Sequence, residues 1–100
     1  WLGIAGANSP VSRRIARHYE LPNSTGVRVQ SIEAHSPAAE AGVESGDLIV
    51  EYDGEPVDSI DQLQRVLDYR RVARETVLTV IRRAQKLSLP VTARERAQRQ

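Results

Sequence analysis

Apolar positions along the chain follow two spacings, and the first is the alternation typical of strands. Leu87, Leu89 and Val91 alternate with polar residues or proline, as in a half-buried strand. Residues 48–50 are apolar in succession, which is typical of a strand covered on both faces. The predicted strands are residues 2–7, 26–34, 47–52, 76–81 and 86–91, with a short one near 56. Alternation breaks near Gln30, which predicts a β-bulge.

The second spacing is helical. Val11, Ile15 and Tyr19 recur every four residues with arginines on the other side, which predicts a helix over 11–19 begun by Ser9–Pro10. In the stretch SPAAEAG, Ser36 is a suitable N-cap and Gly42 suits the left-handed position that ends a short helix.

A third and longer helix is predicted from a capping box. Ser59 is followed three positions later by Gln62, and this pattern opens a helix of about 10–14 residues. Leu63 and Val66 are expected to face the core. The elements together predict an α+β fold, in which a partly open β-barrel or sandwich of five to six strands is capped by one long helix and one or two shorter ones.

Composition narrows the classes of function. The 100 residues form one domain, and a chain beginning at Trp1 is expected to be part of a longer protein. A net charge of +1 gives no electrostatic argument for nucleic acid as a partner. No apolar run approaches the about 20 residues that span a bilayer, so no membrane insertion is expected. The absence of cysteine excludes disulfides and thiolate metal sites.

Catalytic and metal chemistry are not expected. His18 and His35 are the available imidazole bases, and neither accompanies a recognisable nucleophile motif. Asp47, Glu51 and Asp53 lack the loop geometry or histidine spacing of calcium and zinc sites, so they are interpreted as turn-forming or solvated acids. Neither metal nor cofactor is therefore predicted.

The arginine clusters give no argument for nucleic-acid binding either. Arginines at 70, 71 and 74 and at 82 and 83 are not interleaved with aromatic residues that could stack on bases. They are interpreted as a solvated face of the domain.

A binding site is predicted at the opening heptapeptide, WLGIAGA. Gly3, flanked by Leu2 and Ile4, lets backbone N–H groups converge on an anion such as a carboxylate. The small residues Ala5, Gly6 and Ala7 leave room for a peptide to pair along an exposed strand edge.

One face of the long helix is predicted to form the opposite wall of this site. Ile60, Gln64 and Leu67 share that face at spacings of four and seven residues.

Three stretches resemble a known family. Residues 1–4 match its aromatic–apolar–Gly–apolar loop, and residues 36–57, SPAAEAGVESGDLIVEYDGEPV, match its Ser-Pro-Ala, Ala-Gly, Gly-Asp and Asp-Gly run in order and spacing. Residues 59–67 match the helix that lines its ligand groove. On these stretches the chain resembles a PDZ domain, most closely those of HtrA/Deg-type trypsin-like serine proteases, in the circularly permuted bacterial arrangement. The resemblance spans residues 1–92 and leaves 93–100 as a disordered tail.

The resemblance implies a peptide-binding module without catalysis of its own. Leu2, Gly3 and Ile4 would bind a terminal carboxylate, and Ile60, Gln64 and Leu67 would meet ligand side chains, the last of them apolar. The implied partners are peptides, protein C-termini and the protease domain of a parent chain. The residues do not determine localisation, and the resemblance implies a periplasmic or other extracytoplasmic bacterial setting.

The sequence is also compatible with other arrangements and roles. The groove residues could be core, with the groove closed or filled by the chain's own tail. The domain could instead regulate or assemble a protease by contacting neighbouring domains, or belong to a site-2 or C-terminal processing protease. Glycines that relatives place after the long helix and in the final hairpin are replaced here by residues 70–74 and by Ala84–Gln85.

Overall fold

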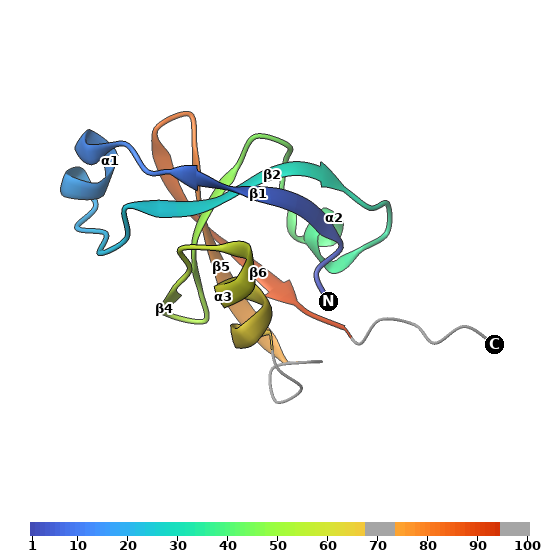
Figure 1. Ribbon diagram of the computed structural model, residues 1–100. Helices are drawn as coiled ribbons and strands as arrows, with labels where there is room; N and C mark the ends of the chain where they lie inside the picture. The colour runs from blue at the N-terminus through green and yellow to red at the C-terminus, as the bar shows by residue number, and fades with distance from the viewer. Residues whose placement is uncertain (68–73, 95–100) are drawn as a thin grey trace.

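One antiparallel sheet and three helices make up the part of the chain that the computed structural model describes, residues 1–67 and 74–94 (Figure 1). The elements in chain order are β1 (Ile4–Pro10), α1 (Arg13–His18), β2 (Thr25–Ile32), α2 (Pro37–Ala41), β3 (Leu48–Tyr52), β4 (Glu55–Pro56), α3 (Ile60–Val66), β5 (Glu75–Arg82) and β6 (Gln85–Thr92). This order of strands and helices is the predicted one.

The sheet has six strands in the order β1-β2-β3-β5-β6, with the short β4 paired to β3 away from this path. Every neighbouring pair is antiparallel, and β5 and β6 pair over all eight residues. The open sheet therefore ends in two edge strands, β1 and β6. These features confirm the predicted mixed fold with five to six strands.

The predicted bulge lies where the strand pattern breaks. Ala5 pairs with Ser31, but the next residue, Gly6, pairs with Val29, so Gln30 has no opposite residue in β1. A Cβ at Gly6 would lie 2.8 Å from the Arg28 carbonyl oxygen. Glycine is therefore required where β1 approaches β2 closely beside the bulge.

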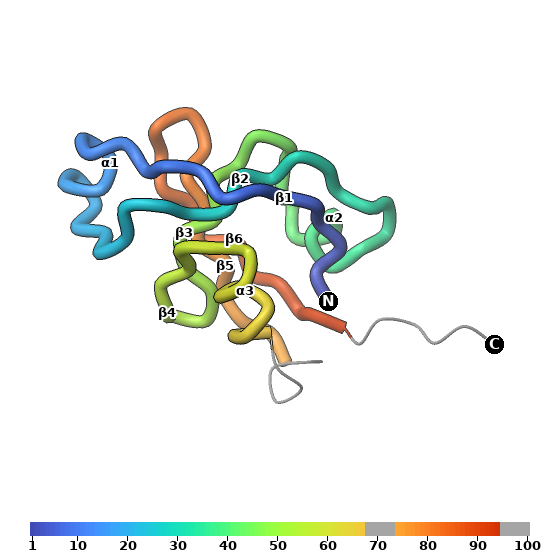
Figure 2. Tube along the Cα trace, in the orientation of Figure 1, coloured from blue at the N-terminus to red at the C-terminus, as the bar shows by residue number. Residues whose placement is uncertain are grey.

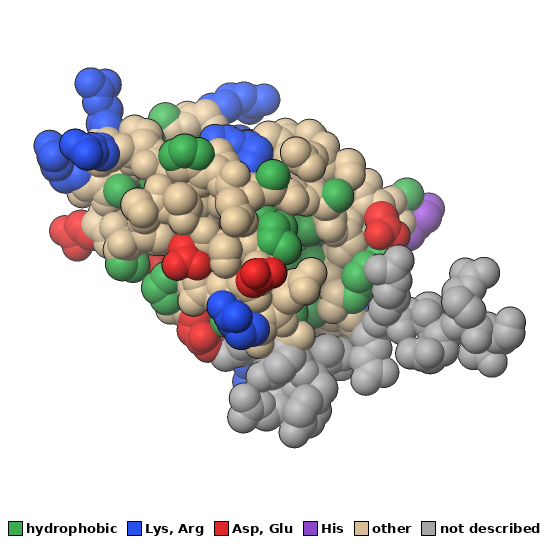
Figure 3. Space-filling view, viewed as in Figure 1, with side chains coloured by type: hydrophobic (Ala, Val, Ile, Leu, Met, Phe, Trp, Pro, Cys, Tyr) green, Lys and Arg blue, Asp and Glu red, His purple; other side chains and the backbone are tan. Residues whose placement is uncertain are grey.

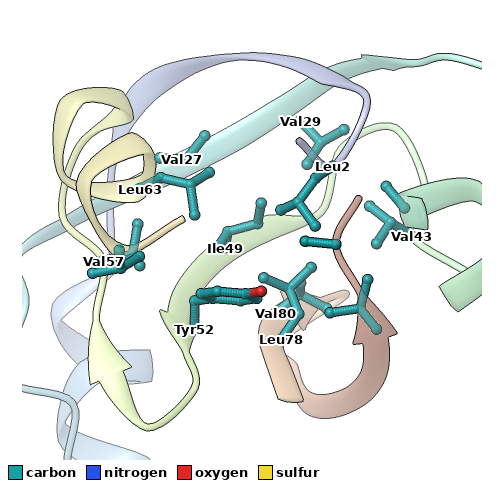
Figure 4. Packing of buried hydrophobic residues seen from close by; sticks show 14 residues of the cluster. Leu2, Val27, Val29, Val43, Ile49, Tyr52, Val57, Leu63, Leu78 and Val80 are labelled. Atoms are coloured by element: carbon teal, nitrogen blue, oxygen red, sulfur yellow. The ribbon is translucent and has the colours of Figure 1, made fainter. Parts of the chain in front are cut away.

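Two hydrophobic clusters cover the two faces of the sheet. The larger cluster packs beneath α2 and α3, and its labelled members, which include Leu2, Ile49, Tyr52 and Leu63, converge in Figure 4. The smaller cluster packs beneath α1 and consists of Val11, Leu21, Leu48, Val50 and Ile81. Each helix thus packs apolar residues against the domain, although those of α1 are only partly buried.

The first helix begins later than predicted. β1 continues through Ser9 to Pro10, which pairs with Thr25, and the side chain of Ser12 caps α1 by accepting from the Ile15 N–H. The prediction that Ser9–Pro10 begins the helix was therefore wrong. Pairing of these residues with β2 outweighs their local preference for a helix start. The arginines of α1 face outward as predicted, and Figure 3 shows basic side chains gathered at this end of the molecule.

The other two helices begin where their caps predict. Ser36 caps α2, which ends at Gly42 with a left-handed φ of 91°, and Ser59 caps α3. However, α3 has seven residues, fewer than predicted, because the backbone leaves the helical region at Leu67. The capping box specified where this helix starts, and no residue signal specified where it stops. The arginines at 70 and 71 lie outside the described residues.

The final hairpin turns without glycine. Arg83 and Ala84 adopt φ values of 51° and 66°, the left-handed pair that a two-residue turn requires. The Tyr19 hydroxyl donates to the Ala84 carbonyl at 3.1 Å and supports this turn from α1. The turn therefore keeps the usual geometry in spite of the missing glycine.

Candidate functional site

A groove of about 270 Å³ lies between the N-terminal segment and α3. It is lined by Trp1, Leu2, Gly3, Ile4, Ile60, Leu63, Gln64 and Leu67. Its two walls come from segments far apart in sequence, the residues at the start of β1 and one face of α3. The groove is open, and its lining is mostly apolar.

The N-terminal segment is held by the residues that lead into α2. The Leu2 carbonyl accepts from the Ala38 N–H at 2.9 Å, and the Gly3 carbonyl accepts from the Glu33 N–H at 2.8 Å. Gly3 has a φ of 86°, and a Cβ there would lie 2.3 Å from the Cβ of Ser36. Only glycine fits this position, both for its backbone angle and for the contact with Ser36.

These bonds orient the amide groups of the segment. In a planar trans peptide the C=O and the following N–H point in opposite directions. The N–H groups of Gly3 and Ile4 therefore point away from the residues that bind the Leu2 and Gly3 carbonyls. Within the part of the chain that the structure describes, the N–H groups of Leu2 and Gly3 have no acceptor. The segment thus offers successive main-chain donors of the kind that hold an anion.

The second wall is positioned by contacts at the start of α3. Ser59 Oγ accepts from the Gln62 N–H at 3.1 Å, and Gln62 Oε1 accepts from the Asp58 N–H at 3.1 Å. The Ile60 N–H donates to Asn8 Oδ1 of β1 at 2.8 Å. Leu63 and Val66 are buried, as predicted. The start of the helix is thus hydrogen-bonded to β1, the strand that continues from the opposite wall of the groove.

At Gly6 the edge of β1 turns its main-chain groups away from the sheet, and no partner for them is found among residues 1–67 and 74–94. Its partner Val29 donates to the Asp47 carbonyl and accepts from the Gly46 N–H, both at 2.8 Å and both on the side away from β1. Gly6 and Val29 therefore form a non-hydrogen-bonded pair. The N–H and C=O of Gly6 point outward from the sheet, where an added strand would lie.

The structure brings most of the predicted site residues together. Leu2, Gly3 and Ile4 line one wall of the groove, and Ile60, Gln64 and Leu67 line the other. Ala5, Gly6 and Ala7 lie further along β1 and are not part of the groove lining. Their place beside a bound peptide stays a prediction.

Two residues that line the groove were not predicted from the sequence to belong to the site. Trp1 was quoted only as part of the loop motif, and Leu63 was predicted to face only the core, but both line the groove. The signal for Leu63 was present, because positions 60, 63, 64 and 67 form one continuous stripe on a helix. Leu63 contributes to both surfaces because it lies at the boundary between core and groove.

One group of charged residues differs from the prediction. Asp47, interpreted as a solvated or turn-forming acid, is 1% exposed and accepts from Arg82 at 2.7 Å and from the Glu44 N–H at 2.9 Å. The hydrogen bond to Asp47 raises the pKa of Arg82 above its ordinary value. This pair joins β5 to the loop before β3. Asp47 is therefore a turn-forming acid, as one of the two interpretations had it, because it bonds to Glu44 within the 44–47 turn. The solvated interpretation was wrong for both Asp47 and Arg82, which form a pair that satisfies the buried carboxylate.

Residues 1–67 and 74–94 contain neither a cluster of metal-ligating side chains nor a membrane-spanning helix. No group of three or more His, Cys, Asp or Glu side chains in residues 1–67 and 74–94 is arranged to hold a metal ion. Over the same residues, no helix has the length and apolar character needed to cross a membrane.

Comparison with known proteins decides the family. The family model for the PDZ domain matches residues 28–82. The chain belongs to the PDZ domain family. It is similar to part of several longer proteins that are named as proteases.

The similar sequences are bacterial proteases. The chain is 30% identical over 92 residues to the "Probable periplasmic serine endoprotease DegP-like" of Halomonas elongata, covering 92% of this chain and 19% of that protein. It is also 30% identical over 83 residues to the protein of the same name from Chlamydia trachomatis, covering 83% of this chain and 17% of that protein. The chain thus spans less than a fifth of the length of these relatives.

Solved structures show the same fold. "HtrA-type protease AlgW with decapeptide" superposes with a TM-score of 0.76 at 22% identity, over 99% of this chain and 30% of that one. "Crystal Structure of the HtrA3 PDZ Domain Bound to a Phage-Derived Ligand (FGRWV)" superposes with a TM-score of 0.64 at 23% identity, over 92% and 82% of the two chains. These matches confirm the PDZ fold.

Proposed function

We propose that this PDZ domain captures the C-terminal end of an extended peptide by adding it as a strand to β1, between β1 and α3. Three features support the proposal: an open apolar groove, N–H groups at residues 3 and 4 that point away from residues 33 and 38, and outward-facing main-chain groups at Gly6. Strand addition to a sheet edge uses these features.

Each part of the site has a role in this proposal. The N–H groups of Leu2, Gly3 and Ile4 bind the terminal carboxylate, and the apolar last side chain enters between the start of β1 and Leu67. Gly6 pairs with the peptide main chain, flanked by Ala5 and Ala7. We expect dissociation constants on the order of micromolar, because ordering a free peptide offsets much of the gain from burial.

On α3, Ile60 and Gln64 meet the side chain two positions before the end of the peptide. The ligand FGRWV of the similar HtrA3 domain ends in valine, which supports an apolar last residue.

The setting follows from the relatives. Proteins similar to this chain are named periplasmic serine endoproteases. We therefore propose that the domain serves an extracytoplasmic HtrA-like protease, in substrate recognition or in regulation of the protease.

The test is an NMR titration of the domain with a peptide that ends in valine, once with a free carboxylate and once amidated. We expect amide shifts confined to residues 2–7 and 60–67, and we expect amidation to weaken binding strongly, so that the amidated peptide needs a much higher concentration to produce them. Equal shifts with both peptides would contradict carboxylate recognition. An absence of shifts at millimolar peptide would contradict peptide binding and favour the assembly role, in which the groove contacts a neighbouring domain.

A further inference from the structure

The two residues that follow β6 lie against the start of the chain. Figure 2 shows the end of β6 close to the N-terminus, and the Arg94 N–H donates to the Trp1 carbonyl at 3.2 Å. Ala93 is 1% exposed. Both residues lie beyond the predicted domain end at 92, and residues 95–100 lie outside the described part.

The side chain of Arg94 reaches a second and a third segment. Its Nη2 donates to the His35 carbonyl at 2.6 Å and lies 3.8 Å from Glu40 Oε2 in α2. We call the contacts of Arg94 with Trp1, His35 and Glu40 the Arg94 clasp. The clasp joins the C-terminal end of β6, the N-terminal segment and the turn that leads into α2.

The His35 end of the clasp is a strained position. His35 has a φ of 62°, a conformation that residues other than glycine rarely adopt. Such conformations persist where surrounding contacts hold them. The carbonyl that this conformation presents is the one that accepts from the Arg94 guanidinium.

The strained turn continues directly into the support of the groove. Ser36 is fully buried, donates to the Glu33 carbonyl at 2.7 Å, accepts from the Ala39 N–H at 3.1 Å and packs against Gly3. The N–H groups of residues 33 and 38 hold the Gly3 and Leu2 carbonyls. A shift of the 33–38 segment would therefore rotate the peptide units whose N–H groups face the groove.

We infer that Arg94, which does not line the groove, is a positioning residue of the peptide site. Its clasp holds the 33–38 segment against Leu2 and Gly3, so that the N–H groups of residues 3 and 4 point at the ligand carboxylate. This inference rests on the proposed function, and it concerns carboxylate recognition rather than contact with ligand side chains.

The experiment compares Arg94→Met, which removes the guanidinium donors, with Arg94→Lys, which keeps a cation. The matched control is Arg74→Met, which removes an exposed arginine paired with Asp53 at 2.9 Å, away from the groove. Affinities are measured for the valine-ended peptide with a free carboxylate and with an amidated end. Amide shifts of Gly3 and Ile4 are recorded in the free domain.

We expect Arg94→Met to weaken binding of the free-carboxylate peptide about fivefold, the ratio that one hydrogen bond supplies, and to leave the amidated peptide unchanged. Arg94→Lys should restore part of the loss, and Arg74→Met should change neither affinity. Equal weakening of both peptides, or no weakening, would overturn the inference.

If the unaltered domain binds no peptide, the proposed function is overturned, and this result does not test the Arg94 clasp. The clasp is then judged by the amide shifts: movement of Gly3 and Ile4 in Arg94→Met supports it, and unchanged shifts overturn it.

Discussion

The two edges of the sheet, β1 and β6, differ in what they present to a strand from outside. β1 carries small uncharged residues at 5–7, and the outward-facing main chain of Gly6 lies beside the groove. β6 carries Lys86 and Pro90, and α2 packs against it. Proline and lysine on an edge strand oppose pairing with other chains.

The geometry of Pro90 sharpens this difference. Its partner Val77 accepts through its carbonyl from the Asp53 N–H at 2.9 Å, on the side of β3. Val77 and Pro90 therefore form a non-hydrogen-bonded pair, so the main-chain nitrogen of Pro90 faces outward from the sheet. At Gly6 of β1 the outward-facing nitrogen carries a hydrogen that can be donated, whereas the nitrogen of Pro90 is part of the proline ring and cannot donate. The same sheet therefore leaves one edge open to strand addition and blocks the other.

The largest expected effect is the loss of stability in Gly3→Ala, which alters the segment that leads into β1. The new Cβ would lie 2.3 Å from Ser36 Cβ at a φ of 86°, so we expect a destabilisation of about 4 kcal/mol from clash and backbone strain combined. The measurement is urea denaturation.

Gly54→Ala is the matched control for Gly3→Ala. Gly54 has a similar φ of 79° with nothing within 4 Å of an added Cβ, and we expect a loss of about 1 kcal/mol from strain alone. Similar losses in the two variants would show that the contact with Ser36 does not fix the start of β1.

A smaller effect is expected from Gly6→Ala, which changes the open edge itself. The added Cβ would lie 2.8 Å from the Arg28 carbonyl oxygen, and this backbone atom cannot rotate away. We expect a loss of about 2 kcal/mol and a displaced β1, measured by denaturation and by amide shifts. Ala7→Ser, at an exposed position of the same strand, should stay within about 0.5 kcal/mol. A loss as large in Ala7→Ser would contradict the special role of Gly6.

Gln64→Leu tests the helix wall that faces the β1 edge. Gln64 is exposed and lines the groove, so the substitution should leave stability nearly unchanged. It should raise affinity about threefold for a peptide with an apolar side chain two positions before its end. The measurement is a peptide titration. Arg65→Leu, on the same helix but outside the groove lining, should leave affinity unchanged; a gain there would point to nonspecific association.

The smallest effect is expected from Pro90→Thr, which gives β6 the N–H that it lacks. We expect stability to change by less than about 0.5 kcal/mol and weak self-association to appear at high concentration, measured by sedimentation velocity. Ser88→Ala, which keeps the proline, should remain monomeric. A monomeric Pro90→Thr would show that α2, not the proline, blocks this edge.

Much of the fold followed from local residue patterns. The caps at Ser36 and Ser59, the left-handed Gly42 and the bulge at Gln30 were predicted and observed, since each depends on residues close in sequence. The family followed from the spacing of the 36–57 stretch, and the family match confirmed it. Boundaries were less accurate, because β1 continues to Pro10 through pairing with β2.

The sequence by itself determined the elements, their order and the two segments that meet at the groove, because these depend on spacing and on local hydrogen bonding. Tertiary structure alone decided which groups became partners across long separations. Asp47 is buried because Arg82 reaches it from β5, and the Ile60 N–H finds Asn8 on β1. The direction of the N–H groups at residues 3 and 4 likewise depends on the 33–38 segment. Only tertiary packing brings the N–H groups of residues 33 and 38 to the carbonyls of Gly3 and Leu2.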